Sequence, residues 1–368
     1  MQNFKQYLTE GGNVQINVGG KTFDAERMDL KKVSRQTMVK SIRTGLKAIN
    51  AAFEKFSGLP LWDSSLINTG DFLSGSTKAF FDLSSIADDE FVKYKPSVGD
   101  IDLMIDGNMA TIAREFLDKT PHGAQFDTLK FIGYKASGDQ WITLWETDFG
   151  QSVQIDLEHA EFIGGKPSPW SAFSHSSAWE DMQNGIKGVF QKQLFRSLAA
   201  KDSKDIIVLK GKKQVPKQVV SSDYTASTKG VRKRIQPILD NSGKQTYMDG
   251  LPVYTELPSK GAEYYTDFEI IFSILFSGAK PTPKEIQEME SFGGMIGLIN
   301  RYLKSAEKQK VLDRFMEILF GKGAQNLYRS DKLRDFREKT TAVRVICKEF
   351  GISWKKYLPL IKQNYKDY

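Results

Sequence analysis

Apolar and polar positions alternate strictly along residues 98–106, which read VGDIDLMID. Ile101 and Leu103 occupy one set of alternate positions, and the carboxylates of Asp100 and Asp102 occupy the other. A period of two is that of a β-strand, whose successive side chains point to opposite faces. We therefore predict a strand with one buried apolar face and an opposite face on which the two carboxylates lie about 6 to 7 Å apart.

A second period, of three and four residues, runs along residues 34–56 and is typical of an amphipathic helix. Ser34 precedes the first apolar position, where an N-cap is expected, and Gly58 follows the last one. We predict that this helix packs on the sheet that carries the carboxylates. The apolar positions are Val39, Ile42, Leu46, Ile49, Phe53 and Phe56.

The same two periods predict further elements before residue 200. Alternation predicts strands at 129–135, 140–146 and 152–158, and a small hairpin within 11–23. Helical spacing predicts one helix that follows Gly107 and stops at Thr120. Another is predicted to be capped by Ser177 and to run without a break to Leu194.

The later part of the chain divides into an irregular part and a helical part. In residues 201–260 the pattern predicts one short strand, 206–209, within a segment that is otherwise irregular connecting chain. Beyond residue 260 helical spacing dominates, and Thr282 with Glu285 forms a capping box around Pro283. The fold class expected is α/β (α+β), with a mixed sheet, flanking helices and a mostly helical C-terminal domain. The boundaries expected are 1–30 for a leader and hairpin, 31–200 for the sheet domain, 201–260 for a basic connecting segment, and 261–368 for a basic helical domain.

Positive charge is concentrated late in the chain. Residues 280–368 hold 19 Lys and Arg against 11 Asp and Glu, whereas the whole chain has a net charge of +7. This asymmetry favours a polyanionic partner, of which RNA is our first choice, although a solvated helical surface would also account for it. In the preceding segment the candidate contacts to nucleic acid are Lys212, Lys213, Arg232, Lys233 and Arg234.

Composition narrows the class of protein further. No run of eighteen apolar residues occurs, so we expect no membrane association. Cys347 is the only cysteine, which excludes a disulfide within the chain and argues against a cysteine-based zinc site. A reducing cytoplasm is the compartment expected.

The turn before the carboxylate strand has the composition of a phosphate-binding loop. Gly75, Ser76 and Thr77 follow a short apolar pair and precede the helical AFF, where exposed backbone N–H groups would attract phosphate. Adjacent carboxylates such as Asp100 and Asp102 repel unless a cation lies between them, and magnesium binds carboxylates together with phosphate oxygens. The two features together predict metal-assisted nucleotide chemistry.

These residues resemble the signature of the polymerase-beta-like nucleotidyltransferase superfamily, which includes poly(A) polymerases, CCA-adding enzymes and antibiotic nucleotidyltransferases. The similarity rests on Gly75-Ser76 followed by Asp100-Ile101-Asp102, and it covers about a third of the chain. The family has a third carboxylate on a neighbouring strand, for which Asp156 in SVQIDLE is the best candidate. Other acids lie close to Asp156 in sequence, and a shift of one residue would change the face on which each lies; they are Glu146, Asp148 and Glu158.

The resemblance implies roles for these residues. Gly75, Ser76 and Thr77 would bind the nucleotide's phosphates. The set formed by Asp100, Asp102 and Asp156 would hold two magnesium ions, with manganese as a substitute. His175, in the loop after the third acid, and Lys187 are the further candidates for binding the nucleoside triphosphate. The reaction would transfer a nucleoside monophosphate to an acceptor hydroxyl.

The acceptor stays open at this stage. An RNA 3′ end is the first choice, and a protein side chain or a small molecule is the alternative. A third hypothesis is a non-catalytic nucleic-acid-binding or virion-internal protein, since the spacer between Ser76 and Asp100 is longer than usual in the family. The first residues also resemble the leaders of large tailed phages that are cleaved after a glutamate, here Glu10, although an ordinary N-terminal segment would read the same way. The expected location is the cytoplasm, that of an infected bacterium if the chain is phage-encoded, with packaging in the virion as the alternative.

Overall fold

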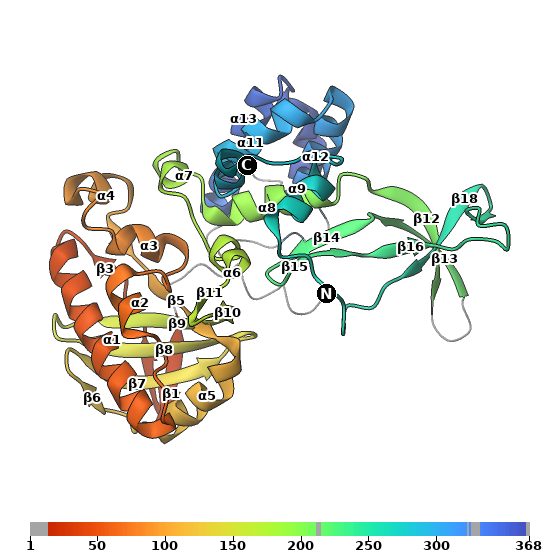
Figure 1. Cartoon of the computed structure of the whole chain (residues 1–368). Helices are drawn as coiled ribbons and strands as arrows, with labels where there is room; N and C mark the ends of the chain where they lie inside the picture. The colour runs from red at the N-terminus through yellow and green to blue at the C-terminus, as the bar shows by residue number, and fades with distance from the viewer. Residues whose placement is uncertain (1–13, 211–214, 322–323, 325–331, 366–368) are drawn as a thin grey trace. The chain divides into compact units, whose positions relative to one another are not determined.

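The protein is described by a computed structural model of mixed α/β class, which confirms the predicted class (Figure 1). The described residues are 14–210, 215–321, 324 and 332–365. The chain forms two compact units: the first ends at Gly185, and the second begins at Ile186. Each unit is described by itself below.

A five-stranded mixed sheet is the centre of the first unit (Figure 1). Its strand order is β5-β9-β8-β7-β6, with β5 parallel to β9 and the other pairs antiparallel. The predictions of the carboxylate strand and of the three later strands are confirmed. The strands are β5 (Asp100–Asp106), β6 (Gln125–Phe126), β7 (Leu129–Ala136), β8 (Gln140–Thr147) and β9 (Ser152–Ala160).

Helices α1 (Arg35–Ser57) and α5 (Ala110–Lys119) cover the apolar face of this sheet. The side chain of Ser34 accepts a hydrogen bond from the N–H of Thr37, and Gly58 ends α1 in the left-handed region at φ 80°. Both predicted ends of the long helix are therefore confirmed. The stripe from Val39 to Phe53 and the buried face of β5, including Ile101 and Leu103, belong to one hydrophobic core. Phe56, the last predicted position of the stripe, is exposed instead.

The opposite face of the sheet has a separate, smaller core. The predicted hairpin forms as β1 (Gln15–Val18) and β2 (Lys21–Asp24), and it packs on β7 and β8. Gly133 permits the close approach, because a Cβ there would lie 2.9 Å from Cγ2 of Val18. This core contains no residue of β5 or β9. The hairpin therefore covers the β7–β8 part of the face on which the carboxylates of β5 lie.

Short elements complete the first unit. Immediately before α5 the chain forms a 3-10 turn, η1 (Gly107–Met109). The remaining elements are β3 (Met28–Asp29), α2 (Ser64–Thr69), α3 (Gly75–Phe81), α4 (Asp88–Tyr94), β4 (Ser97–Val98), β10 (Phe162–Ile163), β11 (Lys166–Pro167), α6 (Pro169–Ser174) and α7 (Trp179–Gln183).

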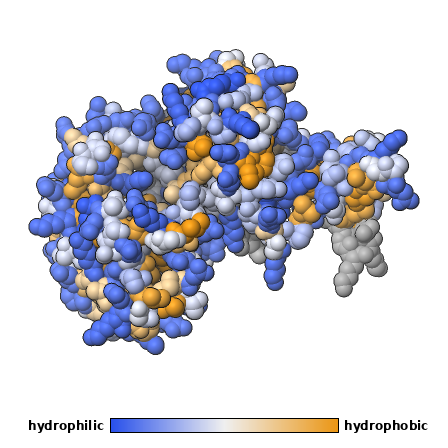
Figure 2. Space-filling view, viewed as in Figure 1, coloured by the Kyte–Doolittle hydropathy of each residue, from blue (hydrophilic) through white to orange (hydrophobic). Residues whose placement is uncertain are grey.

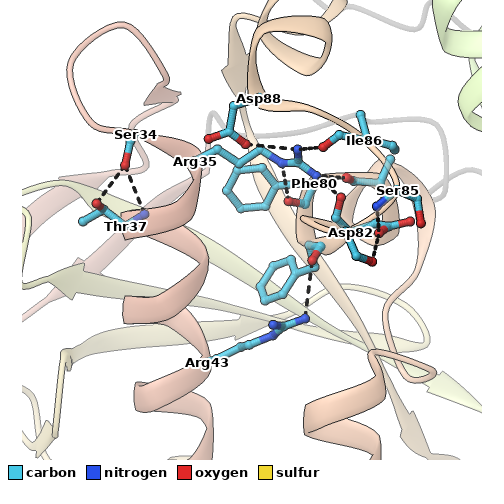
Figure 3. A network of polar contacts seen from close by, with 12 residues as sticks. Ser34, Arg35, Thr37, Arg43, Phe80, Asp82, Ser85, Ile86 and Asp88 are labelled. Carbon is cyan, nitrogen blue, oxygen red and sulfur yellow. Dashed lines mark hydrogen bonds and ion pairs between the residues drawn. The ribbon is translucent and has the colours of Figure 1, made fainter.

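A buried arginine at the start of α1 joins that helix to the segment between α3 and α4 (Figure 3). The guanidinium of Arg35 is almost completely buried and donates to four backbone carbonyls. It also lies 3.3 Å from the carboxylate of Asp88. The carbonyls belong to Ala79, Phe80, Asp82 and Ile86, at donor–acceptor distances of 2.7, 2.8, 2.5 and 2.6 Å. Arg35 therefore fixes the C-terminal end of α3 and the turn that leads to α4.

The predicted continuous helix from Ser177 to Leu194 is wrong. The chain forms α7 with Ala178 as its N-cap, turns at Gly185 with φ 70°, and starts α8 (Gly188–Ala199). The break falls where the two units meet in the sequence. Apolar spacing continues through it, which is why the pattern of side chains did not reveal the turn.

The prediction of a single short strand and irregular connection over residues 201–260 is also wrong. This segment forms a second five-stranded sheet, of order β13-β12-β18-β16 with β17 on β18, and a separate hairpin of β14 and β15. The parallel pair of β12 and β18 joins segments far apart in the sequence. The strands are β12 (Lys204–Lys210), β13 (Val215–Ser221), β14 (Tyr224–Ser227), β15 (Gly230–Lys233), β16 (Ile235–Pro237), β17 (Tyr247–Met248) and β18 (Leu251–Glu256).

The rest of the second unit is helical, as predicted. The capping box of Thr282 and Glu285 forms with both of its reciprocal hydrogen bonds. The elements are α9 (Phe268–Leu275), α10 (Pro283–Glu288), α11 (Phe292–Tyr302), α12 (Ser305–Phe320), α13 (Lys332–Glu349), η2 (Trp354–Tyr357) and α14 (Leu358–Asn364). Among the described residues, none of the helices combines the length and the apolar character that crossing a membrane requires.

Both units expose some large apolar side chains. Figure 2 shows hydrophilic residues over most of the visible face of the first unit. The second sheet exposes several large apolar side chains, some of them on or beside its edge strand β13. The most exposed of these are Val215, Val220, Leu239 and Tyr247, each more than half exposed.

Candidate metal and phosphate site

The parallel pairing of β5 and β9 brings the three predicted acids together. In this register Asp102 lies directly opposite Asp156, and Asp100 lies opposite Gln154. One carboxylate oxygen from each of Asp100, Asp102 and Asp156 lies within 4.8 Å of the other two. Paired residues on neighbouring strands point to the same face. This pairing places Asp156, rather than Glu146 or Asp148, beside Asp102.

The turn of Gly75 is held against the strand that carries Asp102. The N–H of Ser74 donates to the carbonyl of Asp102 at 3.0 Å, and the N–H of Asp102 donates to Oγ1 of Thr77 at 2.9 Å. Gly75 has φ 53°, and a Cβ on it would lie 3.0 Å from Oδ2 of Asp102. Glycine is therefore required both for the backbone conformation and for the close approach of the carboxylate.

Three of the turn's N–H groups are already engaged. Ser74 donates to Asp102, Gly75 donates to the carbonyl of His175 at 2.6 Å, and Thr77 donates to the carbonyl of Ser74 at 3.1 Å. The expectation of exposed backbone N–H groups therefore does not hold for Gly75 and Thr77. The hydroxyl of Ser76 instead accepts a hydrogen bond from the ammonium of Lys95.

Glu158 and His175 fasten the turn from the side of β9. Oε2 of Glu158 accepts from the hydroxyl of Ser74 at 2.5 Å and lies 3.0 Å from Nδ1 of His175. His175 is buried, and its carbonyl accepts the N–H of Gly75. The contacts of His175 position the turn, and its predicted contact with a nucleotide stays a prediction.

The electrostatics of the acids disfavour three full negative charges. Burial, followed by the charges of Asp100, Glu158 and Asp156, raises the pKa of Asp102 well above its usual value, and the charge of Lys95 opposes this. Burial and then the charge of Asp100 raise the pKa of Asp156 in the same way, against hydrogen bonds from Gln154. A cation among these oxygens would relieve the repulsion.

The donor set fits magnesium or manganese. All three acids offer oxygen ligands, which these ions prefer. Gln154 lies beside them, with its Nε2 bonded to both carboxylate oxygens of Asp156 at 2.9 and 3.0 Å. Its Oε1 is buried and has no hydrogen-bond partner within the described part of the chain. The residues present therefore match a divalent cation site with a further oxygen close by.

Magnesium is expected to raise the melting temperature of the wild-type protein by several degrees, because a ligand at about 100 times its Kd adds about 2.7 kcal/mol of stability. The variant Asp102→Asn should show no such shift with magnesium. In EDTA its melting temperature should be higher than that of wild type. Since the pKa of Asp102 is raised in the fold, wild type loses stability relative to the variant as pH rises above 3.8, the usual pKa. Differential scanning fluorimetry from pH 4 to 8, with and without magnesium, measures both effects. Equal magnesium shifts in the two proteins would contradict the site.

The sequence analysis did not assign three residues that the fold adds to this site. They are Lys95, Gln154 and Glu158, the last of which binds the hydroxyl of Ser74 in the turn. Gln154 and Glu158 share the face of Asp156 by the period of two, so strand alternation offered a signal for them. Lys95 follows a short helix in the spacer, and its position depends on tertiary structure that no local pattern encodes.

The other predicted site residues lie outside the first unit or outside the described residues. Lys187 belongs to the second unit, where its ammonium lies 3.5 Å from the carboxylate of Glu338. Arg232 and Lys233 lie on β15, and Arg234 follows it at 3.8 Å from a carboxylate oxygen of Glu256. The remaining predictions, which concern Lys212, Lys213 and the leader, fall on residues that the structure does not describe.

Comparison of the chain with models of known protein families, with curated proteins and with solved structures finds no match.

Proposed function

We propose that this protein is a metal-dependent nucleotidyltransferase, which moves a nucleoside monophosphate from a nucleoside triphosphate to an acceptor hydroxyl and releases pyrophosphate. One observation carries the proposal: Asp100, Asp102 and Asp156 converge within 4.8 Å, next to a glycine turn whose backbone is bonded to that of Asp102. The resemblance in sequence, which rests on the same residues, adds support.

The roles of the residues follow from this arrangement. The three carboxylates hold the cations, and Gln154 keeps Asp156 oriented through two hydrogen bonds. Bound magnesium would promote deprotonation of the attacking hydroxyl and neutralise charge on the pyrophosphate. Phosphoryl-type transfer needs mainly positioning and charge stabilisation, so these side chains and the fixed turn supply most of what the reaction requires.

RNA is the acceptor we propose, because the second unit is rich in basic residues. Of the described candidates, Lys233 is exposed at the end of β15, next to Arg232 and Arg234. Phosphate contacts of this kind give sequence-independent affinity for RNA. Modification of a protein or a small molecule is the competing outcome, and it leaves the metal chemistry unchanged.

The test supplies each α-labelled nucleoside triphosphate with magnesium to wild type and to Asp102→Ala, together with total RNA and total protein from a bacterial lysate. Label in RNA that is lost in the variant would support both the reaction and the acceptor. Label found only in protein would mean that the acceptor is a protein instead of RNA, and the proposed reaction would stand. If wild type labels neither fraction and releases no pyrophosphate from any of the four nucleotides when the small molecules of the lysate are also present, the binding or virion-internal hypothesis takes the place of the enzyme.

A further inference from the structure

Lys95 brings a positive charge to the glycine turn from the long spacer between the two halves of the site. Its ammonium donates a hydrogen bond to the hydroxyl of Ser76, and its charge acts on the carboxylate of Asp102. It is thus bonded to the turn and acts electrostatically on one of the acids. Neither the resemblance nor the spacing of the motifs assigns a role to this residue.

The backbone around Lys95 is fixed on both sides. Its own N–H donates to the carbonyl of Phe91 at 2.8 Å, which ends α4. The carbonyl of the next residue, Pro96, accepts the N–H of Leu30 at 3.1 Å, and Ser97 then pairs in β4 with β3. With the backbone fixed in this way, ligand binding by Lys95 would have to order only the side chain.

The start of the spacer is fixed as well. Arg35 binds the carbonyls of Asp82 and Ile86 and lies 3.3 Å from Asp88, the first residue of α4 (Figure 3). The spacer therefore forms a defined arm, α3 to β4, with Lys95 near its end. The spacer is longer than in the family pattern, and the arm that it forms brings the ammonium of Lys95 to the hydroxyl of Ser76.

We propose that Lys95 binds the terminal phosphates of the nucleoside triphosphate, as the cationic part of the phosphate site; this rests on the proposed function. The N–H groups of Ser74, Gly75 and Thr77 are not offered to an anion, because they donate to backbone carbonyls. A phosphate next to Ser76 meets three carboxylates nearby, so it requires positive charge from a side chain as well as from the metal ions. The ammonium of Lys95 already lies at that hydroxyl.

A different role would be purely structural, with Lys95 offsetting the charge of Asp102 when no metal is bound. The two roles differ in what they do to ligand affinity. A structural counterion changes the stability of the metal-free protein and leaves the affinity for a phosphate chain unchanged. A phosphate-binding lysine changes the affinity for any ligand that has the chain, whether or not it has a base.

The experiment measures Kd for each of the four nucleoside triphosphates, and for inorganic triphosphate, with magnesium and without acceptor, by isothermal titration calorimetry. The full-length chain is used as wild type, Lys95→Met, Lys95→Arg, Lys93→Met and Asp102→Asn. Lys93 is the matched control, because it is an exposed lysine two residues away on α4. Melting temperatures verify that each variant is folded, and Lys95→Arg preserves the charge if the methionine variant is unstable.

Lys95→Met is expected to raise Kd about tenfold for the bound nucleotide and by the same factor for inorganic triphosphate, as loss of one charge-assisted hydrogen bond predicts. Lys95→Arg should retain part of the affinity, and Lys93→Met should match wild type. If Lys95→Met binds both ligands like Lys93→Met, while Asp102→Asn binds them weakly, the role of Lys95 is refuted and the proposed function stands. A loss for the nucleotide but not for inorganic triphosphate refutes the phosphate contact too. If wild type binds none of the nucleotides, the proposed function fails, and this inference fails with it.

Discussion

Asp102→Asn is expected to lower the turnover number by about a thousandfold or more, while the protein stays folded. Asp102 stands at the centre of the site, opposite Asp156 and within 4.8 Å of both other acids. Asparagine preserves the shape but removes a charge that would bind the cations, on which the proposed reaction depends for most of its charge stabilisation. Steady-state kinetics with magnesium and the nucleotide that labels the acceptor give the measurement.

Asp106→Asn is the matched control for this prediction. Asp106 ends the same strand, on the same face by its alternation, but its side chain accepts the N–H of Asn108 at the start of η1. Asparagine can accept the same bond, so turnover within about twofold of wild type is expected. If Asp102→Asn also retains wild-type turnover, the assignment of the acids as metal ligands is wrong.

Arg35→Met is expected to destabilise the first unit by about 4 kcal/mol, the largest loss of stability predicted here. Methionine fills part of the volume but leaves four backbone carbonyls without their donor, and a buried acceptor without a partner costs about 1 to 3 kcal/mol. Urea unfolding followed by tryptophan fluorescence reports on this unit, since five of the six tryptophans precede residue 186.

Arg43→Met provides the comparison for Arg35. Arg43 lies two turns further along α1, where it donates to a single carbonyl, that of Phe81, at 3.4 Å and lies over the ring of the same residue (Figure 3). A loss of about 1 kcal/mol is expected for this variant. Equal losses for the two arginines would show that the four carbonyls do not depend on Arg35 as the contacts imply.

Local patterns were sufficient for much of the first unit. Strict alternation located β5 and β9, and it placed Asp100, Asp102 and Asp156 on polar faces. What brought the acids together is the parallel pairing of the two strands, which the sequence pattern does not specify. The choice of Asp156 over its acidic neighbours rested on the family resemblance and on alternation, and the register now gives it a geometric basis.

The missed features depend on contacts between distant segments. The sheet of the second unit pairs β12 with β18 in parallel, and the intervening residues are polar and rich in turns, so they were read as irregular connection. The break at Gly185 lies within an unbroken apolar spacing. Arg35 and Lys95 look like ordinary charged residues in the sequence, because their partners are a set of carbonyls and a hydroxyl that only the folded chain presents to them.

The parallel pairing of β5 and β9 determines when the three acids can come together during folding. Strands β6 to β9 follow one another and pair as neighbours, so they can form from local hairpins. Strand β5 precedes all of them and must join β9 across α5 and the whole meander. Within this sheet the pairing of β5 with β9 joins the segments farthest apart in the sequence, and the three acids meet only through it. A chain in which β5 has not joined β9 would therefore lack the three-acid arrangement on which the proposed metal site depends.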